Sequence, residues 1–176
     1  MTSRWRGPGW RVVDGNAAQA GEVRDWIKSA IIRYGRPVDP GDAGLAVDEL
    51  FVNAVLHGPR HGRVLIGYCL WPSGVRIVVA DGGGAGQPHL RTGADLDEDG
   101  RGLRLVDDLA AQWGSFRLPG AQVVWSDLGQ PLRAGHGEAW AWLRRVLSAR
   151  QLSAPGPAAP TRPAVTPALL TTARAR

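Results

Sequence analysis

The stretch at residues 48–58, DELFVNAVLHG, sets three polar side chains at regular intervals in an otherwise apolar segment. Glu49, Asn53 and His57 recur every four residues, which is about one helical turn, so on a helix they form one narrow stripe. A carboxylate and an amide oxygen one turn apart can hold a hard cation such as Mg²⁺ through oxygen ligands. On spacing alone, a hydrogen-bonded polar patch is the more common explanation of the Glu49–Asn53 pair.

A second group with chemical potential is Asp81 and the glycines Gly82, Gly83, Gly84 and Gly86 that follow it. An acid at the end of a β-rich run offers a hydrogen-bond acceptor. Glycines without a Cβ atom let the backbone turn sharply and approach a flat ligand closely. The simpler alternative for this stretch is a flexible hairpin or loop.

The third group consists of Gly100 and Gly102, which precede or open a helical pattern. Free backbone N–H groups and the positive end of the helix dipole at such a point bind anions, and a phosphate fits there. The acidic run at 97–99 could instead cap the helix, and it would oppose a phosphate unless Mg²⁺ or movement of the loop intervened. Taken alone, a Gly-x-Gly pattern is weak evidence.

The hydrophobic pattern predicts the elements that must position these residues. Spacing of three to four indicates helices, and β-rich runs bounded by Gly and Pro indicate strands. The expected order is a strand at 10–14, helices at 16–33 and 42–57, strands at 63–71 and 74–81, a loop at 82–99, a helix from about 100, and strands at 115–118 and 121–128. This order predicts an α+β fold, a two-layer α/β sandwich with helices on one face of a mixed, mostly antiparallel sheet.

Beyond the last expected strand, the chain changes character. Residues 137–147, GEAWAWLRRVL, can form one more helix. From about Ser153 the Ala-, Pro- and Thr-rich tail has too few large apolar residues to pack, so we expect it to be disordered. We therefore expect an N-terminal extension at 1–9, one main domain at 10–130, a C-terminal helix at 131–152 and a disordered tail at 153–176.

Composition narrows the classes of function. All 16 acidic residues precede residue 144, as do 15 of the 21 basic ones. The net charge of +5 therefore arises in the last part of the chain, and a basic nucleic-acid-binding face on the main domain is not expected. Cys69 is the only cysteine, which excludes an internal disulfide or a cysteine-based zinc site. The sequence contains neither a signal-peptide pattern nor a membrane-spanning run, so we expect a cytoplasmic location.

The order of the three groups resembles that of the GHKL superfamily of ATP-binding domains, which have the Bergerat fold. Within it, the chain is similar to the stand-alone anti-sigma-factor serine/threonine kinases of bacteria. DELFVNAVLHG resembles the N box, VVADGGGAGQP the first glycine box, and GRGLRLVDDLAAQWG with VVWSDL the second glycine box and closing strand. The resemblance covers roughly residues 10–128, and three ordered boxes are far more specific than any one of them.

The resemblance implies a role for each matching residue. Asn53 would ligate Mg²⁺, and Glu49 would act as general base or orient the attacking hydroxyl. Asp81 would accept a hydrogen bond from the exocyclic amine of adenine, with Gly83 supporting the pocket. The phosphates would be bound by the second glycine box, which comprises Gly100, Arg101, Gly102 and Leu103. Arg104 fits a solvated helix face better than a phosphate contact, and His57 a packing or capping role at the end of the helix.

The resemblance also implies cofactors and partners. ATP and Mg²⁺ are the expected cofactors. The expected activity is phosphorylation of an anti-sigma-factor antagonist, with sequestration of a sigma factor as an additional role. Neither direct nucleic-acid binding nor membrane binding is expected. The sequence leaves the oligomeric state open, since relatives can form homodimers.

Two departures from the family pattern keep an alternative open. The first glycine box has Ala85 where Asp-x-Gly-x-Gly has its second glycine, and the strand before VVW lacks the threonine that many relatives place near adenine. The alternative is a nucleotide-responsive regulator that binds a partner without transferring phosphate. The catalytic part of a two-component histidine kinase is disfavoured, because no pair of long helices with a phosphoacceptor histidine precedes the domain.

Overall fold

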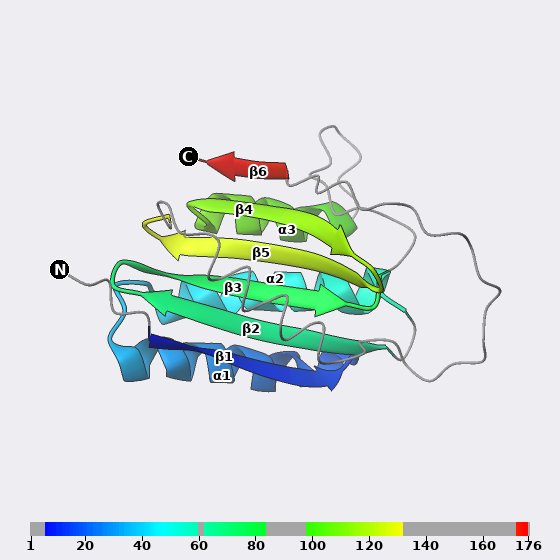
Figure 1. Cartoon of the computed structure of the whole chain (residues 1–176), viewed down its shortest axis with the longest axis horizontal. Helices are drawn as coiled ribbons and strands as arrows, with labels where there is room; N and C mark the ends of the chain where they lie inside the picture. The colour runs from blue at the N-terminus through cyan, green and yellow to red at the C-terminus, as the bar shows by residue number, and fades with distance from the viewer. Residues whose placement is uncertain (1–5, 60–61, 84–97, 132–171, 176) are drawn as a thin grey trace.

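The computed structural model describes residues 6–59, 62–83, 98–131 and 172–175 of the chain. Figure 1 shows a sheet with helices packed behind it. In chain order the elements are β1 (Arg6–Asp14), the 3-10 turn η1 (Ala17–Gln19), α1 (Ala20–Tyr34), α2 (Pro40–His57), β2 (Arg63–Trp71), β3 (Gly74–Asp81), α3 (Glu98–Leu109), β4 (Gln112–Leu118), β5 (Ala121–Gly129) and β6 (Thr172–Ala175).

The strands form one six-stranded sheet in the order β1-β2-β3-β5-β4-β6. Each pairing described is antiparallel. Two tight hairpins fix the register, one closing between Trp71 and Gly74 and the other between Leu118 and Ala121. The predicted α+β class and two-layer arrangement are confirmed, and the described part of the sheet is antiparallel rather than mixed.

Capping residues fix where the helices begin and end. The Asn16 side chain accepts a hydrogen bond from the Ala18 amide at 3.0 Å and starts the first helical segment. Asp39 caps α2 by accepting from the amides of Gly41 and Asp42, and Pro40 occupies the first helical position, where its missing N–H costs nothing. Gly35 ends α1 in the left-handed conformation, with φ of 56°, which glycine adopts without strain.

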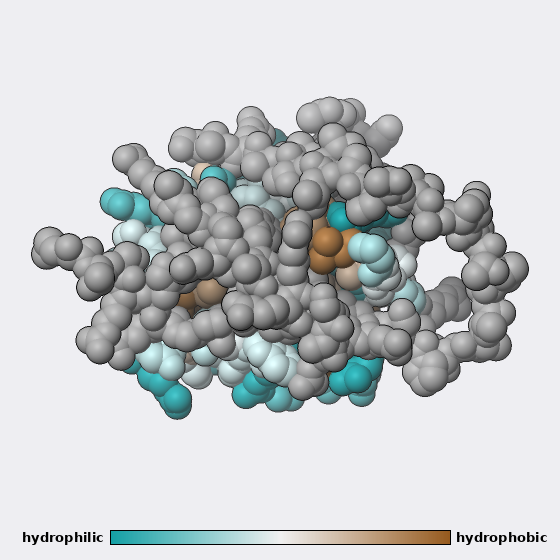
Figure 2. Space-filling model, viewed as in Figure 1, coloured by the Kyte–Doolittle hydropathy of each residue, from teal (hydrophilic) through white to brown (hydrophobic). Residues whose placement is uncertain are grey.

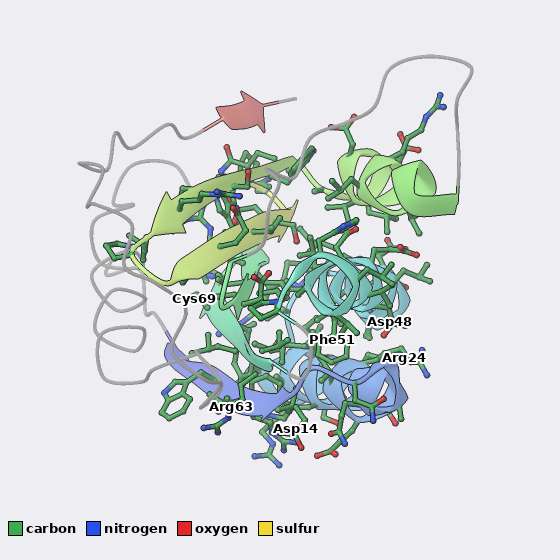
Figure 3. All side chains as sticks on the ribbon, turned by 90° about the vertical axis from the view of Figure 1, so that its right-hand side faces the viewer. Asp14, Arg24, Asp48, Phe51, Arg63 and Cys69 are labelled. Atoms are coloured by element: carbon green, nitrogen blue, oxygen red, sulfur yellow. The ribbon has the colours of Figure 1, made fainter. Side chains whose placement is uncertain are left out.

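All three helices lie on one face of the sheet, and α2 runs between α1 and α3 (Figure 3). Inward residues of α2, among them Leu50, Phe51 and Ala54, are buried against strand residues such as Ile66 and Ile77 in the main core. Within the described residues, no helix combines the length and apolar character needed to cross a membrane. Burial of this one apolar stripe fixes the rotation of α2 about its axis.

The opposite face of the sheet is also buried, which the expected arrangement with helices on one face does not include. Every residue of β3 is buried, and a second apolar cluster that includes Val78 and Trp125 lies on this face. Arg76 and Asp127 form an ion pair here, with Nε–Oδ1 and Nη2–Oδ2 distances of 2.6 and 2.8 Å. The sequence signal was present, because GVRIVVAD is apolar at nearly every position rather than at alternate ones.

Two further differences concern the ends of the chain. β1 starts at Arg6, inside the expected N-terminal extension. β6 lies inside the tail expected to be disordered, because backbone pairing with the edge of β4 needs no large apolar side chains. The C-terminal helix expected at 131–152 lies, apart from residue 131, outside the described residues.

The buried ion pair gives a prediction about stability. Arg76 is 1% and Asp127 0% exposed, so Asp127→Asn removes the negative charge that is bonded to a buried guanidinium. We expect this change to lower the free energy of unfolding by about 3–5 kcal/mol, measured by urea denaturation. Replacing both partners, with Arg76→Met and Asp127→Leu, should restore most of the loss. A cost below about 1 kcal/mol for the single change would contradict a structural role for the pair.

Candidate functional site

Two adjacent carboxylates of α2 point to different neighbours. Asp48 faces α1, where its Oδ2 accepts a hydrogen bond from Arg24 Nη1 at 2.6 Å, and Figure 3 shows the two side chains together. Glu49, about 100° further round the helix, faces α3 instead, where it approaches Gly102. The ion pair with Arg24 thus engages Asp48 and leaves Glu49 as the carboxylate directed at α3.

The contact between Glu49 and Gly102 is so close that any side chain on Gly102 would displace the Glu49 carboxylate. A Cβ atom on Gly102 would collide with Glu49 Oε2 and would lie 3.4 Å from its Cδ. Burial, and secondarily the charge of Asp48, raises the pKa of Glu49 above its ordinary value. The structure therefore brings two predicted site residues together and makes this carboxylate a stronger proton acceptor than a free one.

Asn53 lies one turn beyond Glu49 on the same stripe of α2. Its Nδ2 atom is buried and has no hydrogen-bond partner. Buried amide groups are normally paired, so this one is suited to a ligand. Rotation of the amide by half a turn about its last side-chain bond would present its oxygen at the same place. Asn53 and Glu49 thus supply the oxygen donors that Mg²⁺ prefers.

Asp81 lies at the end of β3 and is 6% exposed. Its Oδ1 accepts a hydrogen bond from the Gly83 amide at 2.7 Å, and Gly83 adopts a φ of 79° that favours glycine. Burial raises the pKa of Asp81, while the Gly83 hydrogen bond and the positive charges of Arg117 and His57 oppose that shift. The result is a buried, oriented acceptor of the kind that recognises a donor group on a flat ring.

Sequence reasoning missed two residues beside Asp81. Gly58 directly follows the helix expected at 42–57, and a Cβ there would lie 3.2 Å from Cβ and Cγ of Asp81. Gln122 is the register partner of Asp81 on β5, and its Oε1 accepts from Arg117 Nε at 2.7 Å. A glycine at a helix end was the available signal for the first. No sequence signal marked Gln122.

The remaining predicted site residues lie along α3. Because α3 begins at Glu98, Gly100, Arg101 and Gly102 lie in its first turns rather than before it; the side chain of Arg101 is outside the described atoms. Leu103 is 6% exposed and packs in the main core, so only its backbone can serve a ligand. Arg104 and His57 are exposed. Gly84 and Gly86 of the first glycine box lie outside the described residues.

Hydrogen bonding holds α3 at its other end. Trp113 Nε1, on β4, donates to Asp107 Oδ1 at 2.9 Å. This bond ties the last turns of α3 to the sheet, while Gly102 ties its first turns to Glu49. The spacing between α2 and α3 is therefore set at two points.

These contacts define an elongated site along one edge of α2. Glu49 lies at one end beside Gly102 of α3, Asn53 lies one turn further along α2, and Asp81 lies at the other end beside Gly58. Gly58 lies nine positions after Glu49, which corresponds to about 13 Å along the axis of α2. Such a site can bind a long ligand with a flat hydrogen-bonding group at one end and an anionic, metal-associated group at the other.

Comparisons with known proteins agree with this arrangement. A profile of the histidine kinase-like ATPase domain matches residues 13–125. A solved structure of the RsbU and RsbW domains of Rv1364c from Mycobacterium tuberculosis resembles the chain with a TM-score of 0.52 and 20% sequence identity. That match covers 73% of this chain and 34% of the other, so this chain spans about a third of that relative, and the likeness concerns the fold alone. Comparison with curated proteins gives no match.

The contact between α2 and α3 gives a prediction about Glu49. Gly102→Ala should displace the carboxylate toward water, because the added methyl group would occupy its place. The pKa of Glu49 should then fall toward its ordinary value, as measured by the ¹³C shift of its carboxyl carbon during a pH titration.

Gly21→Ala is the matched control, because a Cβ there meets only Arg24 Nη2, at 3.8 Å. Both replacements lie in helices and should keep or raise stability, by up to about 1 kcal/mol. An unchanged or higher pKa of Glu49 in Gly102→Ala would show that the two residues are not in contact.

Proposed function

The chain belongs to the family of histidine kinase-like ATPase domains, and on this basis we propose that it is an ATP-dependent protein serine/threonine kinase of the anti-sigma-factor type. The single observation that carries the proposal is the order of groups along α2: Glu49 against Gly102 at one end, the unpartnered amide of Asn53 one turn on, and the buried acceptor Asp81 at the other end. This order of groups fits a nucleotide that lies along α2.

The adenine end of the nucleotide binds at Asp81. Its carboxylate accepts a hydrogen bond from the exocyclic amine, and the Gly83 amide keeps the carboxylate oriented. Gly58 and Gln122 flank the acid and limit where it can move. A buried acceptor left unpaired is costly, so a ring without this donor binds poorly.

The phosphate end binds between α2 and the start of α3. Asn53 supplies an oxygen ligand for Mg²⁺, which neutralises phosphate charge when bound. Free amides in the first turn of α3 and the positive end of its dipole stabilise the phosphates. Little else is required of the protein, because phosphoryl transfer depends mainly on positioning and charge neutralisation.

Glu49 acts on the incoming hydroxyl group. The hydroxyl oxygen of a serine or threonine bonds to the γ-phosphorus, and the bond from that phosphorus to the β–γ bridging oxygen breaks. The hydroxyl proton passes to the Glu49 carboxylate, whose raised pKa favours accepting it.

The proposed substrate is an anti-sigma-factor antagonist, and a sigma factor is the second partner. Support comes from the resemblance of the three boxes and from the fold shared with a chain whose title names RsbU and RsbW domains. The alternative is a nucleotide-responsive regulator that binds these partners without phosphorylating them. Ala85 in the first glycine box favours it, and the two functions differ in whether a phosphorylated product forms.

The catalytic proposal predicts that Glu49→Gln separates binding from transfer. Incubation with Mg-ATP and the antagonist should label serine or threonine with wild-type protein and at least about 100-fold more slowly with the variant. ATP affinity should stay within a few-fold. With wild-type protein, transfer should also slow as the pH falls through the raised pKa of Glu49, because the protonated acid cannot accept a proton.

Full labelling by Glu49→Gln would remove Glu49 from the mechanism. Nucleotide binding by wild-type protein without any labelled product would favour the regulator instead.

The binding proposal predicts that Asp81→Asn abolishes recognition of adenine without harming the fold. Burial disfavours the ionised carboxylate, so the neutral amide should leave the melting temperature of the nucleotide-free protein unchanged or higher. At 100 times the Kd, ATP should add about 2.7 kcal/mol to the stability of wild-type protein. That gain should disappear in the variant. Equal stabilisation of both proteins by ATP would show that Asp81 does not contact the base.

A further inference from the structure

Asp81, Gln122 and Arg117 form a row across three neighbouring strands. Gln122 on β5 is the register partner of Asp81 on β3 and also of Arg117 on β4. The row lies at the right-hand end of the sheet in Figure 1, where β3 and β4 end and β5 begins. One residue, Gln122, therefore stands between the buried acid and an arginine.

The three side chains of this row lie on the helix face of the sheet. Side chains alternate between faces along a strand. Residues an even number of positions away belong to the main core under the helices, namely Val79, Val124 and Trp113. Residues adjacent in sequence belong to the apolar cluster of the other face, namely Ala80, Val123 and Phe116. Figure 2 looks onto that other face, where hydrophobic residues show near the centre. The row thus shares its face with the candidate nucleotide site.

The amide of Gln122 is bonded on both sides. Gln122 is 4% exposed. Its Oε1 accepts from Arg117 Nε at 2.7 Å, and its Nε2 donates to the backbone oxygen of Phe116 at 3.2 Å. A buried amide that is bonded through both its oxygen and its nitrogen is held in one orientation. Gln122 therefore uses its amide to hold the Arg117 side chain in place.

The charge of Arg117 acts on Asp81. Burial raises the pKa of Asp81, whereas the Gly83 hydrogen bond and the charges of Arg117 and His57 lower it. Arg117 approaches from β4 and His57 from the end of α2. An arginine is charged at every pH at which the protein is folded, whereas a histidine loses its charge near neutral pH. Of these two groups, Arg117 is the one whose charge opposes the effect of burial at any working pH.

We propose that Arg117, held by Gln122, is a positioning residue that keeps Asp81 a hydrogen-bond acceptor and so makes the site select a base with an exocyclic amine. This role rests on the proposed function, because it concerns the base end of the same site. Oδ1 of Asp81 is bonded to the Gly83 amide, so Oδ2 reads the base. An ionised Oδ2 accepts from the amine of adenine, whereas a protonated one would donate to a carbonyl at that position.

The first test measures the titration of Asp81 in the nucleotide-free protein, from the ¹³C shift of its carboxyl carbon. Arg117→Gln should move the midpoint to higher pH, because the ionised acid loses a fixed positive charge. Arg117→Lys retains the charge and should keep the midpoint closer to that of wild-type protein. Arg33→Gln is the matched control, because it removes an exposed positive charge from α1 and should leave the midpoint unchanged. Equal midpoints in Arg117→Gln and Arg33→Gln would overturn the proposal.

The second test compares binding of ATP and inosine triphosphate with Mg²⁺ by calorimetry over a series of pH values. Inosine has a carbonyl oxygen where adenine has its amine. Wild-type protein should prefer ATP. The preference should fall several-fold in Arg117→Gln at a pH where Asp81 is protonated in the variant but not in wild-type protein. The phosphates of the two nucleotides titrate alike, so the ratio of affinities reports the base. An equal ratio in both proteins at that pH would overturn the proposal.

A third variant separates the role of Gln122 from that of the charge itself. Gln122→Met removes the bond to Arg117 at similar volume and should move the Asp81 midpoint in the same direction as Arg117→Gln. It also covers the case in which circular dichroism shows Arg117→Gln to be unfolded. An unchanged midpoint in folded Gln122→Met would overturn the holding role.

The two measurements distinguish this inference from the proposed function. Shifted midpoints in a protein that binds neither nucleotide would support the arrangement of charges and overturn the proposed function. Binding of ATP with unshifted midpoints would overturn the role of Arg117 and leave the proposed function standing.

Discussion

Packing of α2 against the sheet is the constraint on which the rest of the site depends. Leu50, Phe51 and Ala54 are buried in the core and fix the rotation of the helix. Asp48 is thereby directed to Arg24, and Glu49 is directed to Gly102. If α2 rotated so that Glu49 turned into the core, its carboxylate would be buried without a partner, at a cost of several kcal/mol. The hydrophobic core thus sets the position of the chemical groups.

The sequence predicted most of the fold and part of the site. Helical spacing predicts α1 and α3, and both strands of the β2–β3 hairpin have their predicted bounds, because local chemistry determines helix caps, tight turns and β-rich runs. The approach of Gly102 to Glu49 and of Gly58 to Asp81 depends on how separate elements pack. Neither contact can be read from spacing alone. Gln122 was missed for the same reason, since its proximity to Asp81 follows from strand register.

The two faces of the sheet have different roles. The helix side bears the candidate nucleotide site along α2, whereas the opposite side buries an apolar cluster and the Arg76–Asp127 ion pair. Buried ion pairs contribute little net stability when both partners are present, yet removal of one is costly. The pair therefore makes this face sensitive to the loss of either charge.

The most direct test of the central claim is a crystal structure of the protein with Mg²⁺ and a non-hydrolysable ATP analogue. The account predicts the adenine amine within hydrogen-bond distance of Asp81, the metal bound to the side-chain oxygen of Asn53, and the γ-phosphate between Glu49 and the start of α3. An analogue bound elsewhere, or one reversed so that its phosphates approach Asp81, would contradict the account.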